Sequence, residues 1–126
     1  MTRARLQFAA WIGAIALALA WGGDASAHAF LTKASPRVGS RIAASPREVR
    51  LWFSEGLEAL FSSLEIDGPG GAPVAEGPVR VEGADRRQMV AALPRPLAPG
   101  RYRVRWKAVA VDSHKTQGDF AFLVGP

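Results

Sequence analysis

The chain has 126 residues and a formal net charge of +5, from 16 lysines and arginines against 11 aspartates and glutamates. This length suits one domain. Because the chain has no cysteine, disulfides, thiolate metal sites, iron–sulfur clusters and cysteine nucleophiles are excluded, and metal ligands must come mainly from oxygen and imidazole groups.

The N-terminal segment has the three parts of an export signal. Two arginines lie within the first five residues, residues 8–20 form an uncharged apolar run, and an Ala-Ser-Ala cleavage sequence ends at Ala27. The apolar core is short for a membrane span, which needs about 20 residues, so a cleaved signal is favoured over an uncleaved signal anchor. We therefore expect a signal peptide at 1–27 and an exported domain at 28–126 that begins with His28.

The excess of positive charge is moderate, and its arginines are spread through the chain. Together with export, this spread argues against nucleic acid as a partner. We interpret the basic residues as a solvated surface that suits anionic lipid or an acidic partner.

Short segments with alternating apolar residues, separated by glycine and proline, predict strands in the exported domain. One lies at 48–53, and another at 63–67 runs into a Gly-Pro-Gly-Gly turn whose glycines allow positive φ. Two more are expected at 79–82 and 88–93, with a short turn between them.

The clearest alternation follows a Pro-Gly turn and covers residues 101–109, with four cations on one face. The other face carries Tyr102, Val104, Trp106 and Ala108. A last strand at 119–124 places Phe120, Phe122 and Val124 together. About seven strands separated by frequent turns predict an all-β fold, an antiparallel immunoglobulin-like Greek-key β-sandwich or barrel.

The two histidines of the chain are both candidate metal ligands. After cleavage, the α-amine and the imidazole Nδ1 of His28 could close a chelate ring on one metal ion. Asp112 and His114 are two residues apart, which places them on one face if the backbone is extended. In a sandwich the first strand commonly lies beside late strands, so the fold can bring the two ends together.

The alternative for the late pair is an ordinary loop. Asp112 would then only shape the turn before residues 116–118, and His114 would be a surface or core histidine without a ligand role. A histidine at the predicted new N-terminus favours the metal site. Joined in space, the groups offer three nitrogens and one oxygen, a set that suits tetragonal Cu(II) better than Ca²⁺ or Mg²⁺ and, by the Irving–Williams order, better than Zn²⁺.

Four sequence blocks resemble CopC-type periplasmic copper-resistance proteins over almost the whole exported domain. They are residues 28–36, 49–56, 96–106 and 110–122, the last of which is the most specific, with the sequence Ala-Val-Asp-Ser-His-Lys-Thr-Gln-Gly-Asp-Phe-Ala-Phe. The resemblance implies a seven-stranded Greek-key β-barrel in the periplasm.

The resemblance also implies a Cu(II) site made by the N-terminal amine and imidazole, a late aspartate and a late histidine, which fall here on His28, Asp112 and His114. A glutamate of the family falls on Glu55, as an axial ligand or as a carboxylate that orients an imidazole or water. Judged by its position alone, an acidic residue at a strand end is more often an ordinary surface residue.

One departure concerns sulfur. Some family members carry a second, methionine-rich site for Cu(I), whereas this chain has only Met1, in the signal, and Met89, alone in a strand. Thioether ligation of a soft ion needs several sulfurs. We therefore expect one Cu(II) site, no Cu(I) site, and a core position for Met89.

The resemblance indicates a carrier or buffer of copper in resistance or homeostasis, not an enzyme. It is expected to be a monomer that passes the copper ion to a CopD-type inner-membrane protein. One alternative is a copper-dependent oxidative enzyme similar to lytic polysaccharide monooxygenases, which also chelate copper with an N-terminal histidine; Asp112 would fill a position that oxygen activation needs open. The other is a metal-free structural sandwich.

Overall fold

The computed structural model describes residues 29–75 and 78–126. The expected signal peptide and His28 lie outside the described residues. The strands are β1 (Leu31–Ser35), β2 (Arg41–Ile42), β3 (Glu48–Phe53), β4 (Ser63–Asp67), β5 (Pro73–Ala75), β6 (Arg80–Glu82), β7 (Gln88–Ala92), β8 (Gly100–Val109) and β9 (Lys115–Val124), with one 3₁₀ turn, η1 (Pro69–Gly71).

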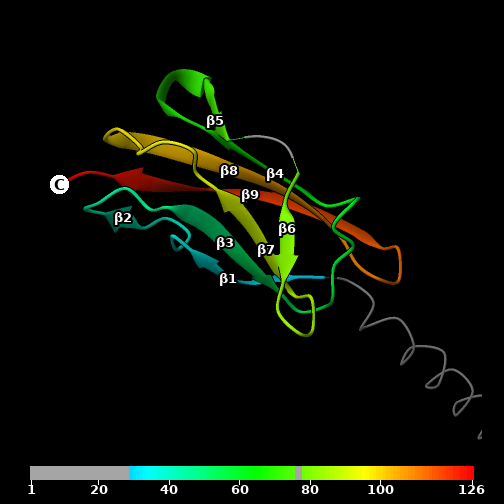
Figure 1. Cartoon of the computed structure of the whole chain (residues 1–126). Helices are drawn as coiled ribbons and strands as arrows, with labels where there is room; N and C mark the ends of the chain where they lie inside the picture. The colour runs from blue at the N-terminus through cyan, green and yellow to red at the C-terminus, as the bar shows by residue number, and fades with distance from the viewer. Residues whose placement is uncertain (1–28, 76–77) are drawn as a thin grey trace, which may run out of the picture.

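The strands form two sheets that pack face to face (Figure 1). One sheet has the order β1-β3-β7-β6 and the other the order β2-β9-β8-β4-β5. Neighbouring strands are antiparallel except β2 and β9, which pair in parallel. The all-β prediction is confirmed, and the two separate sheets make the fold a sandwich rather than a closed barrel.

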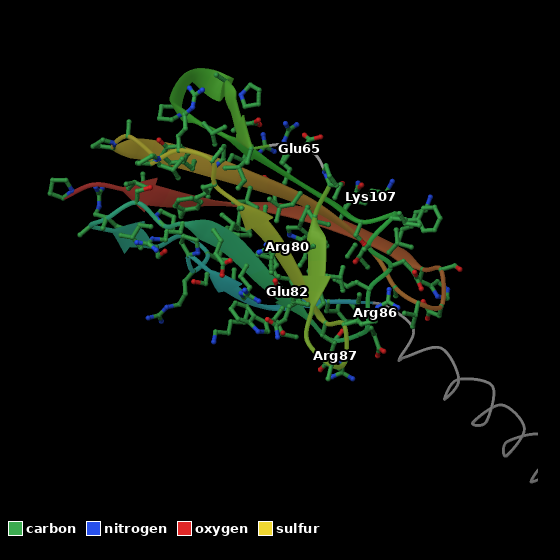
Figure 2. The ribbon with its side chains drawn as sticks, in the orientation of Figure 1. Glu65, Arg80, Glu82, Arg86, Arg87 and Lys107 are labelled. Atoms are coloured by element: carbon green, nitrogen blue, oxygen red, sulfur yellow. The ribbon has the colours of Figure 1, made fainter. Side chains whose placement is uncertain are left out.

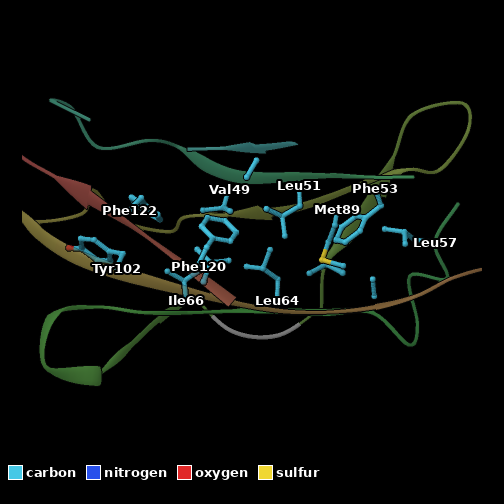
Figure 3. Close-up of a cluster of buried hydrophobic side chains, with 14 of the residues drawn as sticks. Val49, Leu51, Phe53, Leu57, Leu64, Ile66, Met89, Tyr102, Phe120 and Phe122 are labelled. Carbon is cyan, nitrogen blue, oxygen red and sulfur yellow. The ribbon is translucent and has the colours of Figure 1, made fainter. Parts of the chain in front are cut away.

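The apolar positions that alternate in the sequence meet between the two sheets (Figure 3). Val49, Leu51 and Phe53 of β3 are buried, as their spacing predicts. The predicted inner face of β8 is also confirmed, with Tyr102, Val104 and Ala108 buried and Trp106 partly buried; Phe120, Phe122 and Val124 of β9 are buried too. Met89 is 0% exposed, so its predicted core position is confirmed.

The outer faces of both sheets carry paired charges. Figure 2 shows Arg80 and Glu82 on β6 and Glu65 on β4. On one sheet Arg50 Nη1 contacts Glu82 Oε2 at 2.7 Å, and on the other Arg105 Nη2 contacts Glu65 Oε2 at 2.9 Å. The side chains of Arg105 and Glu65 are 46% and 52% exposed, so that pair contributes little to stability. Arg50 is only 22% exposed, and its contact with Glu82 is partly buried. The exposed pair fits the interpretation of the basic residues as a solvated surface.

The structure adds elements that the alternation does not predict. The two-residue β2 and the three-residue β5 are too short for a pattern. β9 begins at Lys115, four residues before the predicted strand, because its polar first half pairs with the end of β8. The first strand, β1, pairs with β3 and not with a late strand. Within the described part of the chain, no helix has the length and apolarity to span a membrane.

Candidate metal centre

Three segments that are distant in sequence meet at one end of the sandwich: the start of the described chain at 29–30, the loop after β3, and the turn between β8 and β9 (Figure 1). Leu57 forms an isolated β-bridge with Ala110, and the amide of Val111 donates to the carbonyl of Gly56 at 3.0 Å. The loop after β3 is therefore fixed against the turn that carries the late candidate ligands.

Asp112 and His114 lie in this turn and not on an extended strand. The Ala110 amide donates to the His114 carbonyl at 2.9 Å, and Ser113 has a positive φ of 76°. The carboxylate of Asp112 accepts the His114 amide at Oδ1, 3.1 Å away. Its other oxygen, Oδ2, lies 3.1 Å from the imidazole Nδ1 of His114. The two side chains are together, as expected, but a turn and not strand alternation joins them.

The same hydrogen bonds favour the ionised form of the Asp112 carboxylate. The pKa of Asp112 is lowered from its ordinary value of 3.8, first by the backbone amide of His114 and then by its side chain. Both side chains are exposed, at 41% for Asp112 and 51% for His114. The turn thus presents an ionised oxygen donor and an imidazole to solvent near neutral pH.

The start of the described chain is held beside this turn. Thr116 Oγ1 donates to the carbonyl oxygen of Ala29 at 2.7 Å. Ser54 and Phe30 share two bonds, from the Phe30 amide to Ser54 Oγ at 2.8 Å and from the Ser54 amide to the Phe30 carbonyl at 2.9 Å. Ala29, which follows His28 in the sequence, therefore contacts Thr116, the second residue of β9.

Glu55 does not join the pair. It is partly buried and precedes Gly56, whose carbonyl accepts the Val111 amide. Among the described residues, no group of three or more histidines, aspartates and glutamates is close enough to hold a metal ion. The described part of the candidate site is therefore one carboxylate and one imidazole, which need further ligands. Such a pair of oxygen and nitrogen donors fits a divalent transition metal.

Sequence reasoning missed two residues at this end, Ser54 and Thr116. Both lie inside the blocks that carry the family resemblance. Their hydroxyl groups have no sequence signal of their own, because each bonds a backbone group 24 or 87 residues away.

A model of the CopC domain matches residues 31–125 of this chain. Protein YobA from Escherichia coli strain K12 is 39% identical over 98 residues, 78% of this chain and 79% of YobA. Copper resistance protein C from Escherichia coli is 35% identical over 107 residues, 80% of this chain and 84% of that protein. Copper transport protein CutJ from Bacillus subtilis is 28% identical over 99 residues, 79% of this chain but 18% of CutJ.

Two solved structures match this chain over most of its length. CopC from Methylosinus trichosporium OB3b superimposes with a TM-score of 0.73 at 35% identity, covering 79% of this chain and 95% of that one. PcoC from Escherichia coli, described as a methionine-rich copper resistance protein, gives a TM-score of 0.67 at 36% identity, covering 78% and 99%.

Proposed function

Because the chain belongs to the CopC family, we propose that it is a periplasmic Cu(II) carrier whose ligands are His28, Asp112 and His114. The resemblance stated from the four sequence blocks is confirmed. The chain is a copper-handling protein and not an enzyme, as its relatives named for copper resistance and transport support. The oxidation state, the ligand set and the role of carrier are the proposal.

The bond between Thr116 and Ala29 is the observation that carries the proposal. It joins the residue after His28 to the strand that starts directly after His114. The free α-amine and imidazole of His28 would then add two nitrogens to the oxygen and nitrogen of the turn. Three nitrogens and one oxygen form a tetragonal set that suits Cu(II). Glu55, on the neighbouring loop, is proposed only to orient a ligand or water.

Cu(II) is favoured over Cu(I) by the position of sulfur. Met89 is the only methionine of the described residues, and it is fully buried between the sheets. The related PcoC is described as methionine-rich, a property that this chain lacks. A soft Cu(I) ion would find no cluster of thioethers here.

Transfer to a membrane partner is supported by two observations. The chain matches 18% of the much longer copper transport protein CutJ, so a similar segment forms part of a transport protein. In addition, three large apolar side chains of the segments that meet at this end are exposed: Phe30 is 58% exposed, on the start of the described chain, Phe61 63%, on the loop that follows β3, and Val111 56%, in the turn. Exposed apolar side chains suit a protein contact. We propose a CopD-type inner-membrane protein as the acceptor of copper.

The test is to express the precursor, determine the mature N-terminus by mass spectrometry, and titrate the product with Cu(II) while recording its EPR spectrum. One alanine placed before His28 should abolish tight binding, because it removes the amine from the chelate ring. The same residue added after Pro126, at the opposite end of the sandwich (Figure 1), is the matched control. Equal binding by the N-terminally extended protein would contradict the proposed site.

Substitutions in the turn test the remaining ligands. His114→Ala and Asp112→Ala should each weaken Cu(II) binding without unfolding the sandwich, because both side chains are exposed. Asp119→Ala is the control, since Asp119 pairs with Arg103 on the outer face of the sheet. Ascorbate-driven peroxide formation with cleavage of chitin or cellulose would instead favour the oxidative enzyme. Binding no tighter than that of an unstructured peptide would favour a metal-free sandwich.

A further inference from the structure

The first described residues are bonded to both sheets at once. Ser54 directly follows β3 of one sheet, and Thr116 lies in β9 of the other. The Oγ of Ser54 accepts the Phe30 amide at 2.8 Å, and the Ser54 amide donates to the Phe30 carbonyl at 2.9 Å. Thr116 Oγ1 donates to the Ala29 carbonyl at 2.7 Å. Three hydrogen bonds therefore fix two consecutive residues between the layers.

Burial adds to these bonds. Ala29 is 0% exposed and its side chain belongs to the core cluster, although it is the first described residue. The first residues of most domains are poorly ordered unless something ties them down. Here a buried methyl group and three hydrogen bonds tie the chain down up to the residue that follows His28.

We propose that Ser54 and Thr116 are positioning residues that hold the mature N-terminus ready for Cu(II). This inference rests on the proposed function. Neither hydroxyl needs to touch the metal. By ordering Ala29 and Phe30 before copper arrives, the two residues spare the chelate the entropy of fixing a free chain end, as preorganised binding groups do.

The expected size of the effect follows from other metal sites. Removal of a group that orients a metal ligand typically lowers metal affinity by about 10- to 100-fold. Thr116→Val keeps the shape of the side chain but removes the donor to Ala29, and Ser54→Ala removes the acceptor of the Phe30 amide. Each should weaken Cu(II) binding by about 10-fold or more. Thr116→Ser keeps the hydroxyl, so this variant should bind Cu(II) like the unaltered protein.

A matched control is available in β1. Thr32 Oγ1 also donates to a backbone carbonyl, that of Trp52, at 3.1 Å. Thr32→Val thus removes the same type of hydrogen bond, from the same end of the chain, without freeing Ala29 or Phe30. We expect its Cu(II) affinity to be unchanged.

The experiment uses correctly processed protein and measures Cu(II) affinity by competition with a chelator, EPR spectra, and thermal unfolding of the copper-free forms. Weaker binding and altered EPR spectra for Thr116→Val and Ser54→Ala, with normal values for Thr116→Ser and Thr32→Val, support the proposal. A lower unfolding temperature with unchanged affinity would assign the hydroxyls a structural role only and overturn it.

A measurement on the unaltered protein keeps the proposal testable if a variant fails to fold. The Phe30 amide should exchange its hydrogen slowly in the copper-free state, because Ser54 Oγ holds it. Exchange as fast as at a free chain end would overturn the proposal. The two proposals also fail differently. Tight binding that survives an added N-terminal residue refutes the copper site itself, whereas N-terminal binding unaffected by Thr116→Val refutes only the positioning role.

Discussion

Gly118 lies against the indole of Trp106, and substitution of this glycine tests the packing between β8 and β9. The two residues are register partners. A Cβ at position 118 would lie 2.7 Å from Cζ2 and 2.9 Å from Cε2 of Trp106. The ring cannot withdraw freely, because Phe53 packs edge-on against it with ring centroids 5.2 Å apart. Gly118→Ala must therefore move the indole, Phe53 or the strand.

The cost can be estimated from these distances. Carbon atoms in favourable contact are about 3.5–4.0 Å apart, so the indole must shift by about 1 Å. Adding methylene groups to a packed core costs about 1–3 kcal/mol. Replacement of glycine by alanine also stabilises the folded state by about 0.4–1 kcal/mol, because it lowers the conformational entropy of the unfolded chain. We expect a net loss of about 1–2 kcal/mol, and each kcal/mol lowers Tm by about 4–8 °C in a domain of this size.

The assay is urea and thermal unfolding of residues 28–126 without copper, followed by circular dichroism. A double-mutant cycle with Trp106→Leu isolates the contact. Without the indole, Gly118→Ala should cost clearly less than it does in the unaltered protein. An equal cost in both backgrounds, or no cost in either, would refute the reasoning.

Three further outcomes are expected. Met89→Leu should change the free energy of unfolding by less than about 1.5 kcal/mol, because volume is nearly conserved, and should leave copper binding unchanged; loss of binding in a titration would show a ligand role. NMR titration should find Asp112 ionised below its ordinary pKa of 3.8; its stabilising contribution is complete above that value and is lost as pH falls through the lowered pKa, and a normal pKa would contradict the hydrogen bonds in the turn. Tyr102→Phe removes a 2.6 Å bond to the Ala98 carbonyl and should lower stability by about 1 kcal/mol in urea unfolding; unchanged stability would show that water replaces it.

The strands that the sequence predicts well are those whose burial follows strict alternation. β3 and β8 are long enough for three or more inward residues each, so their inner faces could be assigned from spacing alone. The first half of β9 could not. Residues 115–118 are polar or glycine, and they become strand only because β8 supplies partners along its whole length. Tertiary pairing decides such segments.

The candidate site was predictable in part for a similar reason. Asp112 and His114 are two residues apart, so their proximity follows from the chain itself, although a turn and not a strand produces it. The contact between Ala29 and Thr116 spans 87 residues, and only the complete fold creates it. The ligand roles of His28, Asp112 and His114 and the role of Glu55 remain predictions.

The meeting of three distant segments at one end of the sandwich links metal capture to folding. Residues 29–30, 54–57 and 110–116 come together only when both sheets have formed. In an unfolded chain the donors of His28 would no longer be held beside those of Asp112 and His114, so Cu(II) bound by all of them would favour the native state by mass action. Under the proposed function, unfolding at this end would release the cargo, and the melting temperature of the protein would report how much copper it holds.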